Sequence, residues 1–430
     1  MKEINLKGLD QNCYTQTLKN GLNIVLIPYT DKKNYFITYA TRYGSDINAF
    51  VPVGSKKGIT VPNGIAHFLE HKMFEQEDGI DPFSFFSESG SGGNASTSYK
   101  STQYICYGTK EFSKNLEYLL KFVNEPYFTD ENVNKEKGII KEEIKMYDDI
   151  PEAVLEVKLK ECLYHIDPHR IDIAGTCKDI DEITKADLYT CYNTFYNPNN
   201  MFIIIAGNFD KEEAIKIIKN SLDNKENRID KITVKEYKEP KSVYKKEEEI
   251  STNIKVPKIG LGYKLSKEDL KINDDLELDL YLSILTTLLF GSSSLFRENV
   301  RNKNLMTNFY YEWDDTKKYK SLLIYSQTED PELLIDEVQK ELDNIEIDEK
   351  DFERIKKVWI ANEVKMIDYV ETTVSNIYDD MIRYHKVIDN KVDLIRKLNI
   401  KKLRDLISRM KFNNRSKVIL LPKKIIAKQK

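Results

Sequence analysis

Residues 63–75 read NGIAHFLEHKMFE, and this stretch decides how the chain is interpreted. Apolar residues recur in it at spacings of three and four, which predicts a helix. Positions i, i+3 and i+4 of a helix share one face, so His67, Glu70 and His71 are expected to project into the same volume. Two neutral imidazoles and an adjacent acid that does not bind the metal are what a hydrolytic zinc site requires. The order is the inverse of the HExxH motif.

The alternative is a chance pairing of two partly buried histidines. The chain contains only 5 histidines, so two of them at this spacing around a glutamate rarely arise by accident. We therefore favour the metal site.

A catalytic zinc site also needs a third protein ligand and an open position for water. The acid-rich segment 132–149, predicted to be helical, offers Glu136, Glu142, Glu143, Asp148 and Asp149. Glu136 and Glu143 are two helical turns apart and share a face. Spacing alone does not choose among the candidates, because charged helix residues are normally solvated.

Composition limits the possible classes of protein. The 430 residues suffice for two or three domains, and 40% hydrophobic with 32% charged residues is typical of a globular protein. Its 66 basic and 70 acidic residues nearly cancel, which argues against a nucleic-acid partner.

Cysteine usage and hydropathy indicate where the protein works. The 5 cysteines are scattered without a CxxC pair, which disfavours a disulfide framework or a thiolate metal site. The first residues lack the apolar core of a signal peptide. The longest apolar runs, such as 201–207, fall short of the roughly 20 residues that span a bilayer. We expect a cytoplasmic protein without a membrane partner.

The order of predicted elements indicates an α+β fold with an internal repeat. Strands at 22–29 and 35–43 read as a hairpin, and Pro151 is expected to end the helix at 130–148. The remaining predicted helices are 111–124, 181–195, 210–221, 276–290, 331–345 and 351–384, and the remaining strands are 95–108, 201–206, 259–263, 309–313, 322–326 and 417–421.

The strongly polar segment 222–250 reads as a linker, and a similar order of elements follows it. We expect an N-terminal domain at 1–225 that carries the HxxEH motif, a linker at 226–250 and a C-terminal domain at 251–430 without a metal motif.

Several segments resemble the pitrilysin/insulinase family of inverzincin metallopeptidases, which includes the mitochondrial processing peptidases. They are HFLEH, the later EKGIIKEE and the MYDDIPE that follows. RIDIAGTCKDI and FYNPNNMFIIIAGNFD are similar to the YmfH-like predicted peptidases of Gram-positive bacteria within that family. The resemblance is strong over 20–210 and diffuse afterwards. It implies two homologous α/β-roll domains, each an antiparallel sheet packed with helices, forming one half of a clamshell.

The resemblance also assigns roles at the zinc site. The family's third ligand is the second of two glutamates seven residues apart, which corresponds to Glu143, 72 residues after His71. Glu136 corresponds to the first, a supporting acid. One Zn²⁺ per chain is implied, with Glu70 as the catalytic base.

Substrate contacts are implied by two further segments. Gly92-Gly93-Asn94-Ala95-Ser96-Thr97 matches the family's GxxNAxT pattern, an edge strand to which a peptide adds by backbone pairing. This makes Gly93, Asn94, Ala95, Ser96 and Thr97 candidate substrate-binding residues. On the residues alone, the pattern is also that of an ordinary Gly/Ser turn before a strand.

In the second half, SSSLFRENVRNKNLM resembles the stretch with which the family holds substrate and the developing oxyanion. Arg301 matches the family's arginine. Asn308 stands where the family has a tyrosine, and Tyr310 or Tyr311 is a candidate substitute.

The function implied is that of a zinc-dependent endopeptidase acting on peptides or small unfolded polypeptides. As a single half-clamshell, the chain is expected to form a homodimer, or a heterodimer with a related, metal-free subunit. The alternatives are a non-catalytic or regulatory subunit of a processing-peptidase-like complex, and a purely structural zinc site. His165, His169 and His385 are interpreted as structural or surface residues, because Pro168 interrupts any helix between the first two.

Overall fold

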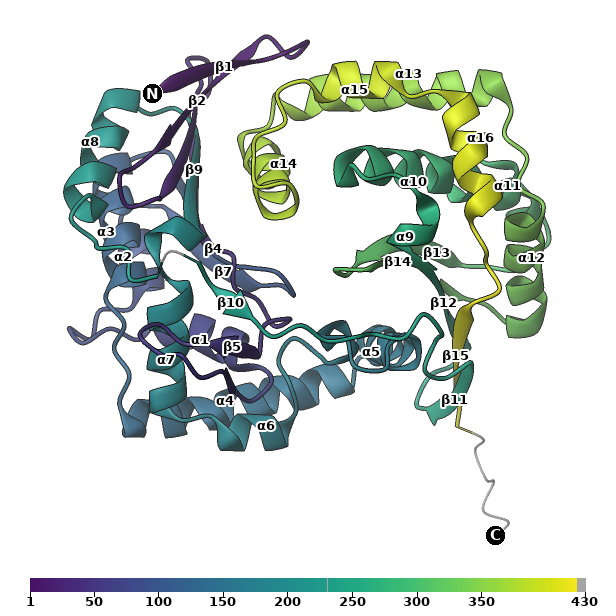
Figure 1. The fold of residues 1–430 in the computed structure, drawn as a ribbon, viewed down its shortest axis with the longest axis horizontal. Helices are drawn as coiled ribbons and strands as arrows, with labels where there is room; N and C mark the ends of the chain where they lie inside the picture. Colours follow the sequence, from purple (N-terminus) through teal and green to yellow (C-terminus); the bar gives the residue numbers. More distant parts are fainter. Residues whose placement is uncertain (230, 424–430) are drawn as a thin grey trace. The chain divides into compact units, whose positions relative to one another are not determined.

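The computed structural model describes residues 1–229 and 231–423, which form two compact units (Figure 1). The first unit comprises Met1–Ile144, Asp172–Glu236 and Asn362–Asp393. The second comprises Lys145–Ile171, Tyr237–Ala361 and the chain from Leu394 onward. Residue 230 of the expected linker and residues 424–430 of the expected C-terminal domain lie outside the described residues.

A seven-stranded sheet forms the centre of the first unit, in the order β1-β2-β3-β9-β4-β8-β7. Its strands are β1 (Lys2–Leu6), β2 (Gln11–Thr17), β3 (Asn23–Pro28), β4 (Tyr35–Thr41), β7 (Gly92–Thr97), β8 (Thr102–Gly108) and β9 (Met201–Gly207). A small second sheet joins β5 (Ala49–Val51), β6 (Ile59–Thr60) and β10 (Thr233–Val234).

The expected hairpin between β3 and β4 is wrong, because β9 lies between them, parallel to β3 and antiparallel to β4. All seven residues of β9 are buried. A strand that is apolar on both faces needs a central position in the sheet, with helices covering both sides.

Alternating residues of this sheet feed two separate cores. Ile203 and Ile205 of β9 face the larger core, which also takes residues from α1 (Ile65–Met73), α3 (Phe112–Asn124) and α8 (Lys211–Leu222). Phe202 and Ile204 face the opposite side, where Val374, Ile377 and Met381 of α14 (Val370–Arg383) cover the sheet. The sheet is thus enclosed on both faces (Figure 1).

The second unit repeats this topology. Its five-stranded sheet has the order β11-β15-β12-β14-β13, with β11 parallel to β15 and the other pairs antiparallel. In the first unit β3-β9-β4-β8-β7 has the same chain order and the same directions. The expected α+β fold with an internal repeat is confirmed. The strands are β11 (Glu247–Thr252), β12 (Lys258–Ser266), β13 (Asn308–Asp315), β14 (Tyr319–Gln327) and β15 (Arg415–Pro422).

Helix α5 (Pro151–Leu163) covers one face of the second sheet, although it comes from the first half of the chain. Two glycines of β12 make room for it. A Cβ on Gly262 would lie 2.6 Å from Leu163 Cδ1, and a Cβ on Gly260 would lie 3.2 Å from Leu155 Cδ1. Glycine within a strand often marks such a close approach.

The two units therefore exchange helices: α5 belongs to the second unit and α14 to the first. This division differs from the contiguous one expected at 225 and 251. The expected single helix at 351–384 is also wrong, because α13 (Glu349–Met366) ends before α14 begins.

Pro151 was expected to end the preceding helix, and in the structure it is the first residue of the next helix, α5. Proline is favoured there because its missing N–H would have no partner in the first turn. The remaining helices are α2 (Pro82–Glu88), α4 (Asp130–Asp148), α6 (Cys177–Glu182), α7 (Lys185–Phe195), α9 (Lys267–Leu270), α10 (Asp275–Phe290), α11 (Leu295–Asn302), α12 (Pro331–Asp343), α15 (Lys391–Lys397) and α16 (Ile400–Arg409).

One described stretch, Asp275–Asn302, is long and apolar enough to cross a membrane by length and composition alone. It comprises α10 and α11, and 50% of its most apolar window is buried. Leu278, Leu282 and Leu285 belong to the core of the second unit. We therefore interpret α10 as a core helix, which passes the same test.

Candidate active site

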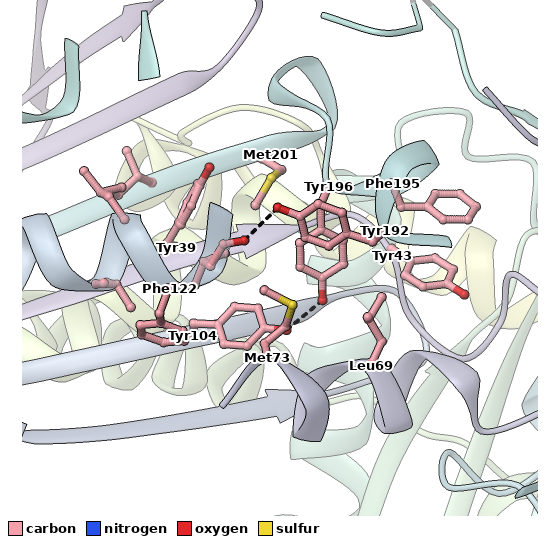
Figure 2. Packing of buried hydrophobic residues seen from close by; sticks show 14 of the residues in the cluster. Tyr39, Tyr43, Leu69, Met73, Tyr104, Phe122, Tyr192, Phe195, Tyr196 and Met201 are labelled. Atoms are coloured by element: carbon pink, nitrogen blue, oxygen red, sulfur yellow. Dashed lines mark hydrogen bonds between the residues drawn. The ribbon is translucent and has the colours of Figure 1, made fainter. Parts of the chain in front are cut away.

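Helix α1 is held from both its start and its buried side. Gly64 precedes it with φ +80°, and a Cβ there would lie 2.1 Å from the Ala174 carbonyl oxygen, so no other residue fits. Figure 2 shows Met73 of α1 beside Tyr104, and Leu69 of the same helix belongs to the same core. This packing fixes the rotation of α1, and with it the direction in which the motif residues project.

Helix α4 supplies the two glutamates. Thr129 caps it, since its hydroxyl oxygen accepts from the Asn132 N–H at 3.1 Å while its own N–H donates to the Asn132 side chain at 2.9 Å. Val133 and Ile140 anchor α4 in the core. The other acidic candidates of the segment, Glu142, Asp148 and Asp149, are exposed.

His67, His71 and Glu143 converge, and their ligand atoms all lie within 4.8 Å of one another. The Glu143 carboxylate oxygens lie 3.8 Å from His67 Nε2 and 3.5 Å from His71 Nε2. These separations are too long for good hydrogen bonds. They are close to the roughly 3.4 Å expected between ligands of one tetrahedral zinc ion with bonds of about 2.1 Å.

The chemistry of the donors also fits zinc. Burial, and then the charge of His71, lowers the pKa of His67 to about 4, so this imidazole is neutral at pH 7. Once His71 also gives up its proton to a metal, two imidazole nitrogens and one carboxylate leave a fourth position for water, as in hydrolytic zinc sites. Among the described residues, this is the one group of three or more His, Cys, Asp and Glu side chains able to hold a metal.

Glu136 supports His71 rather than joining the ligand group. Its Oε1 lies 3.1 Å from His71 Nδ1, the nitrogen that does not face Glu143. Burial lowers the pKa of His71, but the hydrogen bond and charge of Glu136 outweigh it, so the pKa is raised. A carboxylate on the far nitrogen of a metal-binding histidine fixes the ring and its tautomer.

Glu70 is buried to 8% exposure and is held by Thr97, whose hydroxyl donates to Glu70 Oε2 at 2.6 Å. Burial raises the pKa of the Glu70 carboxyl, and the Thr97 hydrogen bond opposes this rise. The sequence pattern pointed to Thr97 only as a substrate contact. Residues two apart in a strand share a face, so Thr97 faces the same side as Ala95, toward α1 and Glu70. This alternation is the sequence signal that could have related Thr97 to Glu70.

Strand β7 is the last in the first sheet, and it pairs with β8 only among the described strands. Asn94 and Ser96 are exposed, whereas Ala95 packs against the core. Gly93 leaves space for the Phe86 ring, because a Cβ there would lie 2.7 Å from that ring. The expected edge strand is therefore present beside α1, and its glycines accommodate the protein's own aromatic residues.

The remaining candidates, Arg301, Asn308, Tyr310 and Tyr311, belong to the second unit and are described only within it. Arg301 is exposed near the end of α11. The Asn308 side chain accepts from the Gln327 backbone N–H at 2.9 Å and so completes the end of β13.

The two tyrosines after Asn308 have different surroundings. Tyr310 is 59% exposed and donates to Glu312 at 3.4 Å. Tyr311 packs against Phe290 in the core of the second unit. Of the two, Tyr310 presents its ring to solvent.

His169 is buried and pairs with Asp314 at 2.8 Å, so its role is structural. Pro168 begins a short 3₁₀ helix, Pro168–Arg170, which does not extend back to His165. His385 is exposed. All five cysteines are free.

Two family models match the chain. Insulinase (Peptidase family M16) matches residues 38–177, and Peptidase M16 inactive domain matches residues 182–358. The first range includes His67, Glu70, His71, Thr97, Glu136 and Glu143, and the second includes Arg301 and Asn308.

Known proteins resemble the chain over most of its length. An uncharacterized zinc protease of Bacillus subtilis, YmfH, is 38% identical over 346 residues, which is 80% of each chain. The crystal structure of an M16-like peptidase from Alicyclobacillus acidocaldarius has a TM-score of 0.90 at 30% identity, over 96% of this chain and 99% of that one.

The periplasmic protease PqqL from Escherichia coli shares the fold at 18% identity, with a TM-score of 0.73. The match covers 96% of this chain but 48% of PqqL. The chain thus spans about half the length of that protein.

Proposed function

The chain belongs to the M16 peptidase family, and from this premise we propose that it is a zinc-dependent endopeptidase. His67, His71 and Glu143 bind the ion, one per chain, and Glu70 is the catalytic base. The observation that carries the proposal is the convergence of three ligand atoms within 4.8 Å of one another, with a buried carboxylate beside them.

Zinc, when bound, supplies an activated water with a pKa of about 7 and polarises the scissile carbonyl. The protein's own residues handle the proton. Glu70 has one oxygen occupied by Thr97, which leaves the other free to take a proton from the water and deliver it to the leaving amine. Glu136 keeps His71 oriented by accepting a hydrogen bond from the Nδ1–H group of its imidazole.

The description "inactive domain" for one family model does not bear on these residues. That model begins at residue 182, after the site helices, whereas the insulinase model covers residues 38–177. The description fits the second half of the chain, where no metal-binding group lies among the described residues.

A substitution of the base separates catalysis from metal binding. We expect Glu70→Gln to retain zinc and to lose peptide hydrolysis by a factor of about 10² to 10⁴, the usual contribution of a positioned base. Glu142→Gln, an exposed neighbour on α4, is the control and should behave as wild type. Zinc content by atomic emission and cleavage of a quenched-fluorescence peptide library are the measurements.

Two results would contradict the proposal. Cleavage by Glu70→Gln at the wild-type rate would remove Glu70 from the mechanism. A wild-type protein that binds zinc and cleaves no peptide in the library would favour the alternative, a non-catalytic subunit of a processing-peptidase-like complex.

We also propose that the active assembly contains two such chains, either a homodimer or a pair with a related subunit lacking the metal. The support is the length relation, since one chain corresponds to 48% of PqqL. Substrate would add to β7 through Gly93–Thr97, and Arg301 is a separate candidate for substrate binding that follows from the family resemblance. Light scattering during size-exclusion chromatography measures the number of chains, and a monomer with full activity would refute the pairing.

A further inference from the structure

Lys72 is a fully buried lysine directly after the last histidine of the motif. Its side chain has 0% exposure, although lysine is seldom buried completely unless it is paired. Its ammonium group donates to Glu75 and lies 3.7 Å from Glu136 Oε2. A buried charge at this place therefore contacts the carboxylate that supports His71.

The two oxygens of Glu136 have different partners. Oε1 lies 3.1 Å from His71 Nδ1, and Oε2 faces the Lys72 ammonium. The Glu136 side chain is only 11% exposed, so water contributes little to its orientation. The direction of the carboxylate depends on these two neighbours.

We propose that Lys72 is a positioning residue of the metal site, which holds Glu136 so that His71 presents Nε2 toward Glu143. The inference rests on the proposed zinc-binding function of His67, His71 and Glu143. Lys72 is not one of the three proposed ligands. It acts through Glu136.

Packing alone does not explain a lysine here. Methionine has a similar length and fills the same space without the cost of removing a charge from water. If Lys72 only filled the core, Lys72→Met would leave zinc affinity unchanged and the metal-free protein equally or more stable. If Lys72 positions Glu136, the same substitution removes the ammonium group beside Glu136 Oε2, and the support of His71 weakens.

The test measures zinc affinity of the full-length protein, stripped of metal and titrated with Zn²⁺ against a chromogenic chelator. Substitution of a residue that orients a metal ligand typically costs about 10- to 100-fold in affinity, and we expect a loss of this size for Lys72→Met. Lys72→Arg, which keeps the charge, should recover most of the affinity. Glu136→Gln should lose as much as Lys72→Met, and the double variant should be no weaker than Glu136→Gln alone.

Glu75→Gln is the matched control, because Glu75 is the other carboxylate partner of Lys72 and the carboxylate on His71 Nδ1 is that of Glu136. It should bind zinc as the wild type does. Thermal unfolding of each metal-free variant confirms that it is folded, and Lys72→Gln replaces Lys72→Met if the latter does not fold.

Wild-type affinity in Lys72→Met would overturn the inference while leaving the proposed function intact. The inference would also be overturned if the fold-loss of zinc affinity in the double variant equalled the product of the two single losses. Lys72 would then act independently of Glu136. A wild-type protein that binds no zinc would instead refute the proposed function.

Discussion

Replacing Thr97 by valine separates the two roles that this residue can have. Valine matches threonine in shape and lacks the hydroxyl that donates to Glu70 Oε2 at 2.6 Å. Thr97 is partly buried at the end of β7, so the substitution leaves no cavity. What is lost is the hydrogen bond to the buried Glu70 carboxylate and a longer one, 3.3 Å, to the Thr102 hydroxyl.

The size of the effect follows from that bond. Hydrogen bonds to charged groups contribute about 1.5–3 kcal/mol, and about 1.4 kcal/mol corresponds to a tenfold change in rate. If the whole bond serves to orient Glu70 in the transition state, kcat should fall about 10- to 150-fold. KM should remain unchanged, because Glu70 does not bind the ground-state peptide in this mechanism.

Steady-state kinetics on a quenched-fluorescence peptide give both constants, and zinc content is measured in parallel. Thr97→Ser keeps the hydroxyl and should restore kcat to near the wild-type value. A higher KM with unchanged kcat would refute this reasoning. It would support the interpretation from the sequence, in which Thr97 contacts substrate along the edge of the sheet.

Two further substitutions test the fold. Gly262→Ala should lower the free energy of unfolding by about 1–3 kcal/mol, because its Cβ would lie 2.6 Å from Leu163 Cδ1. Gly138→Ala, on α4 with open space around it, should raise the free energy of unfolding by about 0.5–1 kcal/mol. Urea unfolding measures both, and equal stability of the two variants would contradict the packing. Burial raises the pKa of Asp380 from 3.8 to about 6, against the opposing charge of Lys391, so the folded protein holds a proton between pH 4 and 6 that the unfolded chain has lost. The free energy of unfolding should therefore fall by about 3 kcal/mol as pH rises through that window, and Asp380→Asn should lack this fall; parallel pH profiles of the two proteins would contradict it.

The local pattern around the motif was sufficient to predict α1 and α4. Apolar spacing in residues 63–75 predicts the helix, and the HxxEH order places His67 and His71 on one face, as the structure has them. The choice of Glu143 needed the family resemblance, because spacing treats it no differently from Glu142.

Features that depend on distant partners could not be predicted. The hairpin at 22–43 looked plausible because the strand that separates its two halves begins only at Met201. Helix α5 was missed because its apolar face packs against Leu323 of β14 and Val418 and Leu420 of β15, which come much later in the chain. Lys72 and Thr97 look like ordinary polar residues until the chain is folded around them.

The exchange of α5 and α14 has a consequence for how the molecule is made. The first sheet cannot be covered on its second face until residues 370–383 have been synthesised, long after its own strands. During translation this face, with Phe202 and Ile204 on it, stays open to water or to a chaperone. A ribosome stalled between the end of β9 and residue 370 should therefore carry a first domain with an exposed apolar face. If the two halves of the chain are expressed separately, they should become soluble only when produced together.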